Sequence, residues 1–94
     1  MKRQDNWLRR FRDSVYGENP QLSRQPVVEI LGNKRILIEN HRGVQVYERD
    51  RIQVCVKFGS IKVLGNCLSL CYMSGSQLVI TGDIQSVSLE SGCD

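Results

Sequence analysis

The four cysteines are the residues whose chemistry depends most on spacing, and they stand at positions 55, 67, 71 and 93. Their intervals along the chain are all unequal and do not match the paired C-x2-C knuckles of zinc sites. On one strand Cys67 and Cys71 would lie about 13 Å apart, since a strand rises about 3.3 Å per residue, and a disulfide tolerates roughly 7 Å. No apolar secretory segment follows Met1. We therefore expect Cys55, Cys67, Cys71 and Cys93 to be free packing thiols, with no metal and no cofactor.

The single histidine, His41, is the residue that a catalytic triad or a Cys-His pair would have to use. It lies between Asn40 and Gly43, in a stretch typical of a turn, so we interpret it as an exposed turn histidine. A hydrolase centred on His41 is the alternative. Neither G-x-G-x-x-G nor G-x4-G-K-[ST] occurs in the chain, so no phosphate-binding loop is predicted. The pattern favours a protein that is not an enzyme.

The charge balance bears on nucleic-acid binding. The net charge is +3, from 13 basic and 10 acidic residues, which is small for a nucleic-acid-binding footprint. The aromatic residues do not interleave with basic residues on one strand, as a base-stacking platform would require. We therefore expect no nucleic-acid partner. A regulatory module that binds nucleic acid is kept as the alternative function.

The elements that must position these residues are short strands. From Val27 onward the apolar period is two: in 52–58 the residues Ile52, Val54, Val56 and Phe58 alternate with polar neighbours, which is typical of a half-buried strand with these residues in the core. Similar runs occupy 27–31, 35–39, 44–48, 60–64, 67–73, 77–81 and 84–89. Separated by turn residues, they predict up to eight strands in an all-β domain over 27–90, a small antiparallel β-sandwich, with a tail at 91–94.

Three pairs of glycine with Asn or Asp recur at strand ends: Gly32-Asn33, Gly65-Asn66 and Gly82-Asp83. The interval from the first pair to the second is much longer than that from the second to the third, whereas a solenoid needs a fixed repeat. Hairpin turns explain the pairs adequately. A β-solenoid-like roll is the alternative fold. The free edges of a small sandwich also make self-association with a second copy an open expectation.

The N-terminal segment 1–17 differs from the rest, because its apolar residues follow a helical period. Trp7, Leu8, Phe11 and Val15 share one stripe. The remaining circumference carries the basic residues Lys2, Arg3, Arg9, Arg10 and Arg12. This pattern predicts an amphipathic helix over 1–17, followed by a polar linker over 18–26. The apolar stripe has two interpretations, namely docking on the β-domain or contact with an anionic membrane or a partner's groove.

The stretch 32–43, with the sequence GNKRILIENHRG, resembles the signature of the YabP/YqfC family of bacterial sporulation proteins, and of its YqfC branch in particular. The similarity continues through Ile52–Phe58, 59–65 and 78–87. The resemblance implies a non-enzymatic protein needed for endospore formation, an adaptor or structural component with a β-sandwich fold. It also implies a membrane-associated partner of the YqfD type. The expected location is the mother-cell cytoplasm, with peripheral contact at the forespore membrane left open.

Turn chemistry gives the most distinctive part of that stretch a structural expectation. Asn40, His41, Arg42 and Gly43 join the run ending at Glu39 to the run starting at Val44. They are predicted to form a hairpin loop with Gly43 at a positive φ and with His41 and Arg42 exposed at the tip. Because turn chemistry does not require His-Arg at a tip, we hypothesise that Asn40, His41, Arg42 and Gly43 contact a partner.

Overall fold

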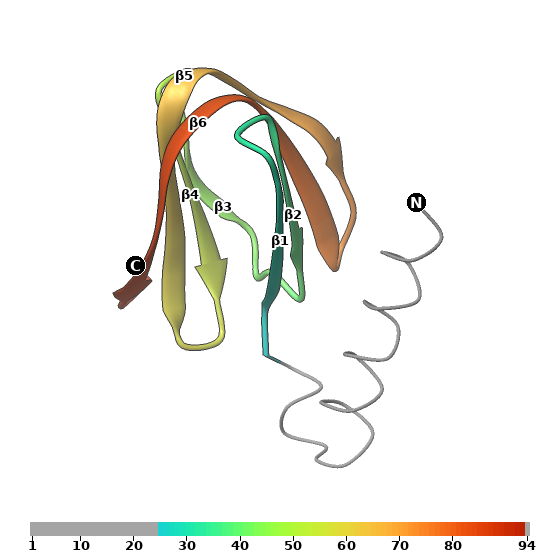
Figure 1. The fold of residues 1–94 in the computed structure, drawn as a ribbon. Coiled ribbons are helices and arrows are strands. Elements are labelled where there is room, and N and C mark those ends of the chain that lie inside the picture. The colour runs from blue at the N-terminus through green and yellow to red at the C-terminus, as the bar shows by residue number, and fades with distance from the viewer. Residues whose placement is uncertain (1–24, 94) are drawn as a thin grey trace.

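The computed structural model describes residues 25–93, which form six antiparallel strands in one open sheet (Figure 1). The strands are β1 (Val27–Leu31), β2 (Arg35–Glu39), β3 (Val44–Tyr47), β4 (Arg51–Val56), β5 (Gly59–Met73) and β6 (Gln77–Ser91). Their order across the sheet is β1-β2-β6-β5-β4-β3. The predicted all-β class is confirmed, and the alternative β-solenoid-like roll is wrong. The helix predicted over 1–17 lies outside the described residues.

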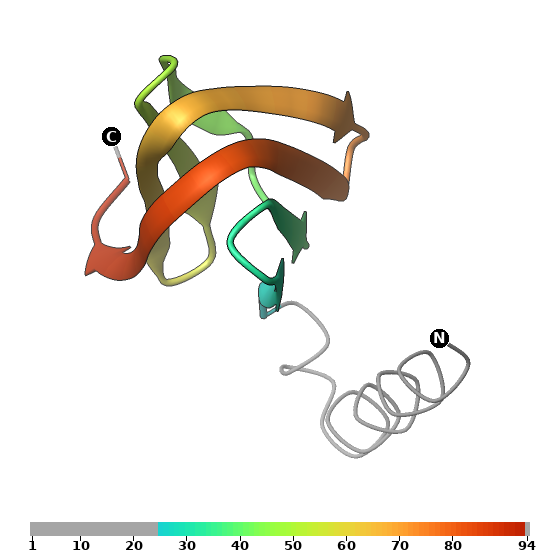
Figure 2. The ribbon, with the colours of Figure 1, turned by 45° about the horizontal axis from the view of Figure 1, so that its top comes forward.

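The two long strands β5 and β6, of 15 residues each, arch over the molecule and bend the sheet into two layers (Figures 1 and 2). In the first layer, residues 77–81 of β6 pair with β2 on one side and with the end of β5 on the other. In the second layer, residues 59–64 of β5 pair with β4 and with residues 86–91 of β6. The layers of the predicted sandwich therefore belong to one continuous sheet and not to two separate ones.

The bends lie at two of the glycine pairs that resembled turns. Gly65 pairs with Ile84 and Asn66 pairs with Asp83 across the two strands, and the register of the pairing shifts there. Gly82 has φ +139°, and a Cβ on it would lie 2.7 Å from the Cys67 carbonyl oxygen. A bend this tight therefore needs glycine. The prediction of turns at these positions is wrong, and eight predicted runs become six strands because two pairs of runs are continuous.

The turn between β1 and β2 braces the bend of β6. The backbone N–H of Gly82 donates to the Lys34 carbonyl oxygen at 3.2 Å, and that of Ile84 donates to the Asn33 carbonyl oxygen at 2.8 Å. The Lys34 ammonium and the Asp83 carboxylate form an ion pair at the same place. All three recurring glycine pairs therefore meet at one corner of the fold.

The turn between β3 and β4 braces the bend of β5 in the same way. The Gly65 N–H donates to the Asp50 carbonyl oxygen at 3.1 Å, and the Leu68 N–H donates to the Arg49 carbonyl oxygen at 2.7 Å. Each bend thus satisfies backbone donors that the sheet pairing leaves free, as buried backbone groups require.

The core lies between the two layers and consists of the inward-facing residues of the alternating runs. Its buried members are Ile36, Ile38, Ile52, Val54, Val56, Ile61, Val63, Leu68, Leu78, Ile80 and Ile84. The period-two prediction is therefore confirmed for β2, β4 and the first half of β5. It is wrong for Phe58, whose surface is 44% exposed, because β4 ends at Val56 and Phe58 belongs to the following turn.

Candidate functional site

Residues 40–43 connect β2 in the first layer to β3 in the second layer, so they form a crossover and not a hairpin loop. β2 has β1 on one side and β6 on the other, whereas β3 pairs with β4 at the far edge of the sheet. A hairpin requires neighbouring strands. The hairpin prediction is therefore wrong, because β6, the last strand in sequence, takes the position beside β2 in the sheet.

Asn40 turns the chain out of β2. It adopts the left-handed conformation with φ 63°, which asparagine tolerates better than most residues. Its backbone N–H donates to the Ser76 carbonyl oxygen at 2.6 Å. Its side-chain Nδ2 donates to the Gln25 carbonyl oxygen at 2.8 Å. Asn40 thus ties the crossover both to the β5–β6 hairpin and to the segment that precedes β1.

His41 is buried, with 7% of its surface exposed, so the expectation of an exposed turn histidine is wrong. The backbone N–H of Gly43 donates to Nδ1 at 2.9 Å, which makes Nδ1 an acceptor. Nε2 lies 2.8 Å from the Ser74 carbonyl oxygen and must therefore carry the proton that it donates. The imidazole is the Nε2–H tautomer: Nδ1 fixes the backbone of the crossover itself at Gly43, and Nε2 bonds the crossover to the β5–β6 hairpin.

Gly43 and Arg42 carry the crossover onto β4. The Arg42 N–H donates to the Cys55 carbonyl oxygen at 2.7 Å, and the Cys55 N–H donates to the Gly43 carbonyl oxygen at 2.8 Å. Gly43 has φ 115°, so its predicted positive φ is confirmed. The Arg42 side chain is not buried, and within residues 25–93 its guanidinium makes no hydrogen bond or ion pair.

Glu39 begins this stretch as a buried carboxylate, with 8% of its surface exposed. Gln77 on the neighbouring strand β6 donates to it through Nε2 at 2.6 Å. The string Glu39–Gly43 is therefore mostly structural. Of the residues predicted to contact a partner, the structure presents the Arg42 side chain to solvent and uses Asn40, His41 and Gly43 to shape the chain beneath it.

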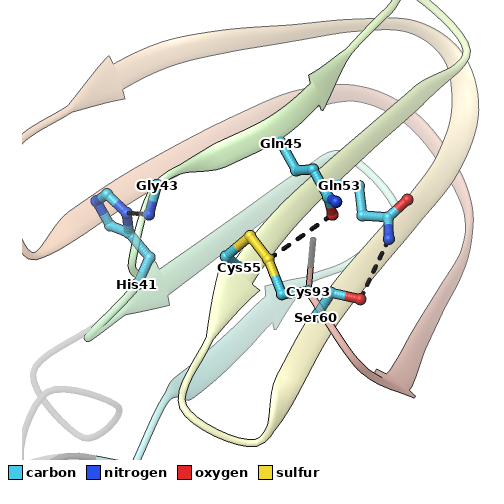
Figure 3. The surroundings of a disulfide bond; sticks show 7 residues. All are labelled: His41, Gly43, Gln45, Gln53, Cys55, Ser60 and Cys93. Carbon is cyan, nitrogen blue, oxygen red and sulfur yellow. Dashed lines mark hydrogen bonds between the residues drawn. A yellow bond between two sulfur atoms is a disulfide. The ribbon is translucent and has the colours of Figure 1, made fainter.

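A disulfide joins Cys55 to Cys93, with 5.6 Å between their Cα atoms and a separation of 38 positions in sequence. The expectation of four free thiols is therefore wrong for this pair. After β6 the tail folds back over β4 (Figure 3), where Gln45 Oε1 lies 3.8 Å from Cys93 Sγ. Ser60, fully buried there, accepts a hydrogen bond from Gln53 Nε2 at 3.2 Å. The disulfide adjoins the crossover because Cys55 also pairs with residues 42 and 43.

Cys67 and Cys71 are free, so the expectation of free thiols is confirmed for this pair, but both are exposed and do not pack in the interior. Cys67 lies in the bend of β5 with φ 54°. Within residues 25–93, no three side chains of His, Cys, Asp or Glu gather as a metal site would require. No helix in this described part is long and apolar enough to cross a membrane.

A shallow pocket lies beside the bend of β5 and is lined by Tyr47, Glu48, Arg49, Cys67, Leu68 and Ser69. The Leu70 N–H donates to the Tyr47 phenol oxygen at 3.1 Å. This bond, together with one from the Ser69 side chain, lowers the pKa of Tyr47 below its ordinary value. The same bond joins the edge strand β3 to the end of β5. Sequence reasoning gave no sign of this pocket, because its residues come from separate strands.

The residues predicted to form a membrane-binding or partner-binding helix lie outside the described residues. They are Trp7, Leu8, Phe11, Val15, Arg9, Arg10 and Arg12. Their roles stay predictions.

Comparison with known proteins places this geometry in a family. No curated protein and no solved structure matches the chain. The YabP family model matches residues 23–93, about three quarters of the chain, and spans all six strands, the crossover and the disulfide. Membership of this family suggests a sporulation-related role. On the extent of this match, the chain belongs to the YabP family.

Proposed function

We propose that this protein is a non-enzymatic adaptor or structural component of endospore formation, from the YqfC branch of the family, acting with a membrane-associated partner of the YqfD type. The match of the family model over residues 23–93 is the observation that carries the proposal. The resemblance of residues 32–43 to the YqfC signature supports the choice of branch and of partner.

The contacts of His41 support a role without catalysis. A hydrolase would need a free imidazole nitrogen to accept a proton from its nucleophile. Here Nδ1 accepts the Gly43 N–H and Nε2 donates to the Ser74 carbonyl oxygen. The imidazole thus holds two parts of the fold together, as a component of a rigid binding module does.

Arg42 is the candidate contact residue of this module. It projects from the crossover between the two layers, on a backbone held by Cys55 and by the buried His41. A fixed backbone reduces the entropy lost when the side chain binds. The guanidinium would pair with a carboxylate on the partner, because its planar donors match carboxylate geometry.

The proposed location is the mother-cell cytoplasm, at the forespore membrane. Residues 1–20 carry five basic and three acidic side chains, and a short helix with so small an excess of charge binds lipid weakly by itself. Recruitment by the membrane-associated partner is therefore the mechanism that we propose, with peripheral membrane contact following from it.

Affinity capture from membranes of sporulating cells tests the proposal. The tagged full-length chain should recover a membrane-associated sporulation protein. Deletion of the gene for the tagged chain should lower spore yield. Arg42→Glu should weaken the capture without changing the melting temperature. Arg49→Glu is the matched control, because Arg49 is also exposed but lies on the β3–β4 turn. Normal spore yield after deletion would refute the role in sporulation, and recovery of nucleic acid in place of a membrane protein would favour the regulatory alternative.

A further inference from the structure

One side of the bent sheet is open, and we call it the open side. It is bounded by two strand edges that pair with no further strand of the described part, namely β1 and residues 86–91 of β6. The edges meet where the β1–β2 turn is bonded to the bend of β6 through Gly82 and Ile84. Away from this corner they separate, and no Cα atom of β1 lies within 8 Å of a Cα atom of β6. Neighbouring strands would be about 4.8 Å apart, so the two edges cannot pair with each other.

The residues along the open side belong to the core face of the sheet but are not covered. Ile30 is the cross-strand partner of the buried Ile36, and Leu89 is the partner of the buried Ile61. Directly opposed residues point to the same face. Ile30 is nevertheless 52% exposed and Leu89 is 67% exposed, the highest value among the large hydrophobic residues of the described part.

The opposite side of the sheet is bridged. There the edges are β3 and the end of β5, and the Leu70 N–H donates to the Tyr47 hydroxyl across them. The crossover closes the end of that side through the bond from His41 to the Ser74 carbonyl oxygen. Among the hydrogen bonds within residues 25–93, none joins β1 to residues 86–91 of β6. The open side therefore lacks a segment that covers the gap between its two strand edges, whereas the Tyr47 hydrogen bond and the crossover connect the edges of the opposite side.

The chain that precedes the described residues has the attachment point and the composition needed to cover this gap. It meets the described part at Gln25, two positions before β1 begins. The Gln25 carbonyl oxygen is held by Asn40 Nδ2 at 2.8 Å, so the chain leaves the fold beside the wide end of the open side. Of the linker 18–26, residues 18–24 precede Gln25 and can reach up to about 23 Å when extended, at about 3.3 Å per residue. Beyond it stands the apolar stripe of Trp7, Leu8, Phe11 and Val15.

We propose that this stripe docks on the open side and covers Ile30, Leu89 and the half-buried Val28 and Val87. The N-terminal segment then completes the core in the free protein, because burial of exposed apolar surface stabilises the fold. Its basic face points to solvent. The proposal is independent of the sporulation role, since it concerns how one chain closes its own core.

The fluorescence of Trp7 tests the proposal in the full-length protein, because Trp7 is its only tryptophan. In dilute buffer without lipid, Trp7 emission should be blue-shifted and protected from acrylamide. Leu89→Gln and Ile30→Gln should shift the emission to the red and raise the quenching toward that of the unfolded chain. Tyr72→Gln is the matched control: Tyr72 is 53% exposed, but it pairs with Val79 on the outer face, so its variant should leave Trp7 unchanged. Nuclear Overhauser effects should connect the Trp7 indole to the Ile30 and Leu89 methyl groups.

Three results would overturn the proposal. Trp7 emission that is solvent-exposed in buffer and shifts only with anionic phosphatidylglycerol vesicles would assign the stripe to a membrane. If the blue shift vanishes on dilution and the undiluted protein has the mass of a dimer, the open side is covered by a second copy of the chain. An equal response of the Tyr72→Gln variant would show that Trp7 does not report on the open side. Circular dichroism verifies that each variant is folded.

Discussion

His41 illustrates how a residue that suggests chemistry can serve the fold. It is the only histidine of the chain, and its two ring nitrogens are hydrogen-bonded to the Gly43 amide and the Ser74 carbonyl. A buried side chain with two such partners positions the chain and leaves no nitrogen for a substrate. The neighbouring Arg42, whose side chain reaches solvent, is the residue that we propose for recognition.

Replacing His41 and Arg42 separately should show that the His41 side chain stabilises the fold and that the Arg42 side chain does not. His41→Ala leaves the Gly43 donor and the Ser74 acceptor without their partner, so it should lower the free energy of unfolding by about 1–3 kcal/mol. Arg42→Ala removes a solvent-facing side chain and should change it by less than about 0.5 kcal/mol. Urea denaturation measures both values. Equal stability of His41→Ala and the wild type would contradict the structural role of the imidazole.

Gly43 offers a second test at the residue scale. Its φ of 115° is open to glycine, and no atom lies within 4 Å of the position that a Cβ would occupy. Any loss therefore comes from backbone conformation and not from crowding. Gly43→Val should destabilise the fold by about 1–3 kcal/mol. Gly75 also has open space and has no positive φ, so Gly75→Ala should be nearly neutral. Thermal melts of both variants measure the difference. A neutral Gly43→Val would refute the assigned conformation.

At the scale of elements, the two bends and the disulfide decide the shape. β5 and β6 continue through their bends because turns from β1–β2 and β3–β4 accept their free backbone donors. The disulfide then fastens the tail after β6 to β4, beside the crossover. The elements around the crossover are thus held from both ends of the described chain.

Loss of the disulfide should therefore weaken the fold. Cys93→Ser opens a loop of 38 residues, and chain entropy gives about 4 kcal/mol for a loop of that length. The denaturation midpoint should fall for Cys93→Ser and for the wild type in reductant, and the two effects should not add. Cys67→Ser is the control, since Cys67 is exposed and unpaired. An unchanged midpoint in reductant would show that the disulfide does not form in solution.

At the scale of the whole molecule, the core depends on which face of each strand turns inward. Val54 is fully buried, whereas Phe58 is 44% exposed, although both stand in the same alternating run. Val54→Ala should cost about 2–3 kcal/mol through the cavity that it leaves. Phe58→Ala should cost less than about 1 kcal/mol, because much of its surface already contacts water. Chemical denaturation compares the two, and a larger loss for Phe58→Ala would place it in the core after all.

The candidate site could be predicted only in part. The positive φ of Gly43 follows from local turn chemistry, and residues 40–43 are distinctive because turn chemistry does not require His-Arg at a tip. The burial of His41 and the crossover path were not predictable, because both depend on the β5–β6 hairpin, which lies far from His41 in sequence. The disulfide had no signal either, since a separation of 38 residues says nothing about proximity in space.

The sequence by itself determined the all-β class and the inward face of β2, β4 and the first half of β5, because the alternation of apolar residues is a local property with a period of two. It did not determine which Gly-Asn or Gly-Asp pair reverses the chain. Gly32-Asn33 lies in a turn, while Gly65-Asn66 and Gly82-Asp83 lie in bends. The local preference for unusual backbone angles is the same in all three. Only the tertiary structure decided between them, because β5 and β6 pair with each other on both sides of the bend and the brace from distant turns satisfies their backbone.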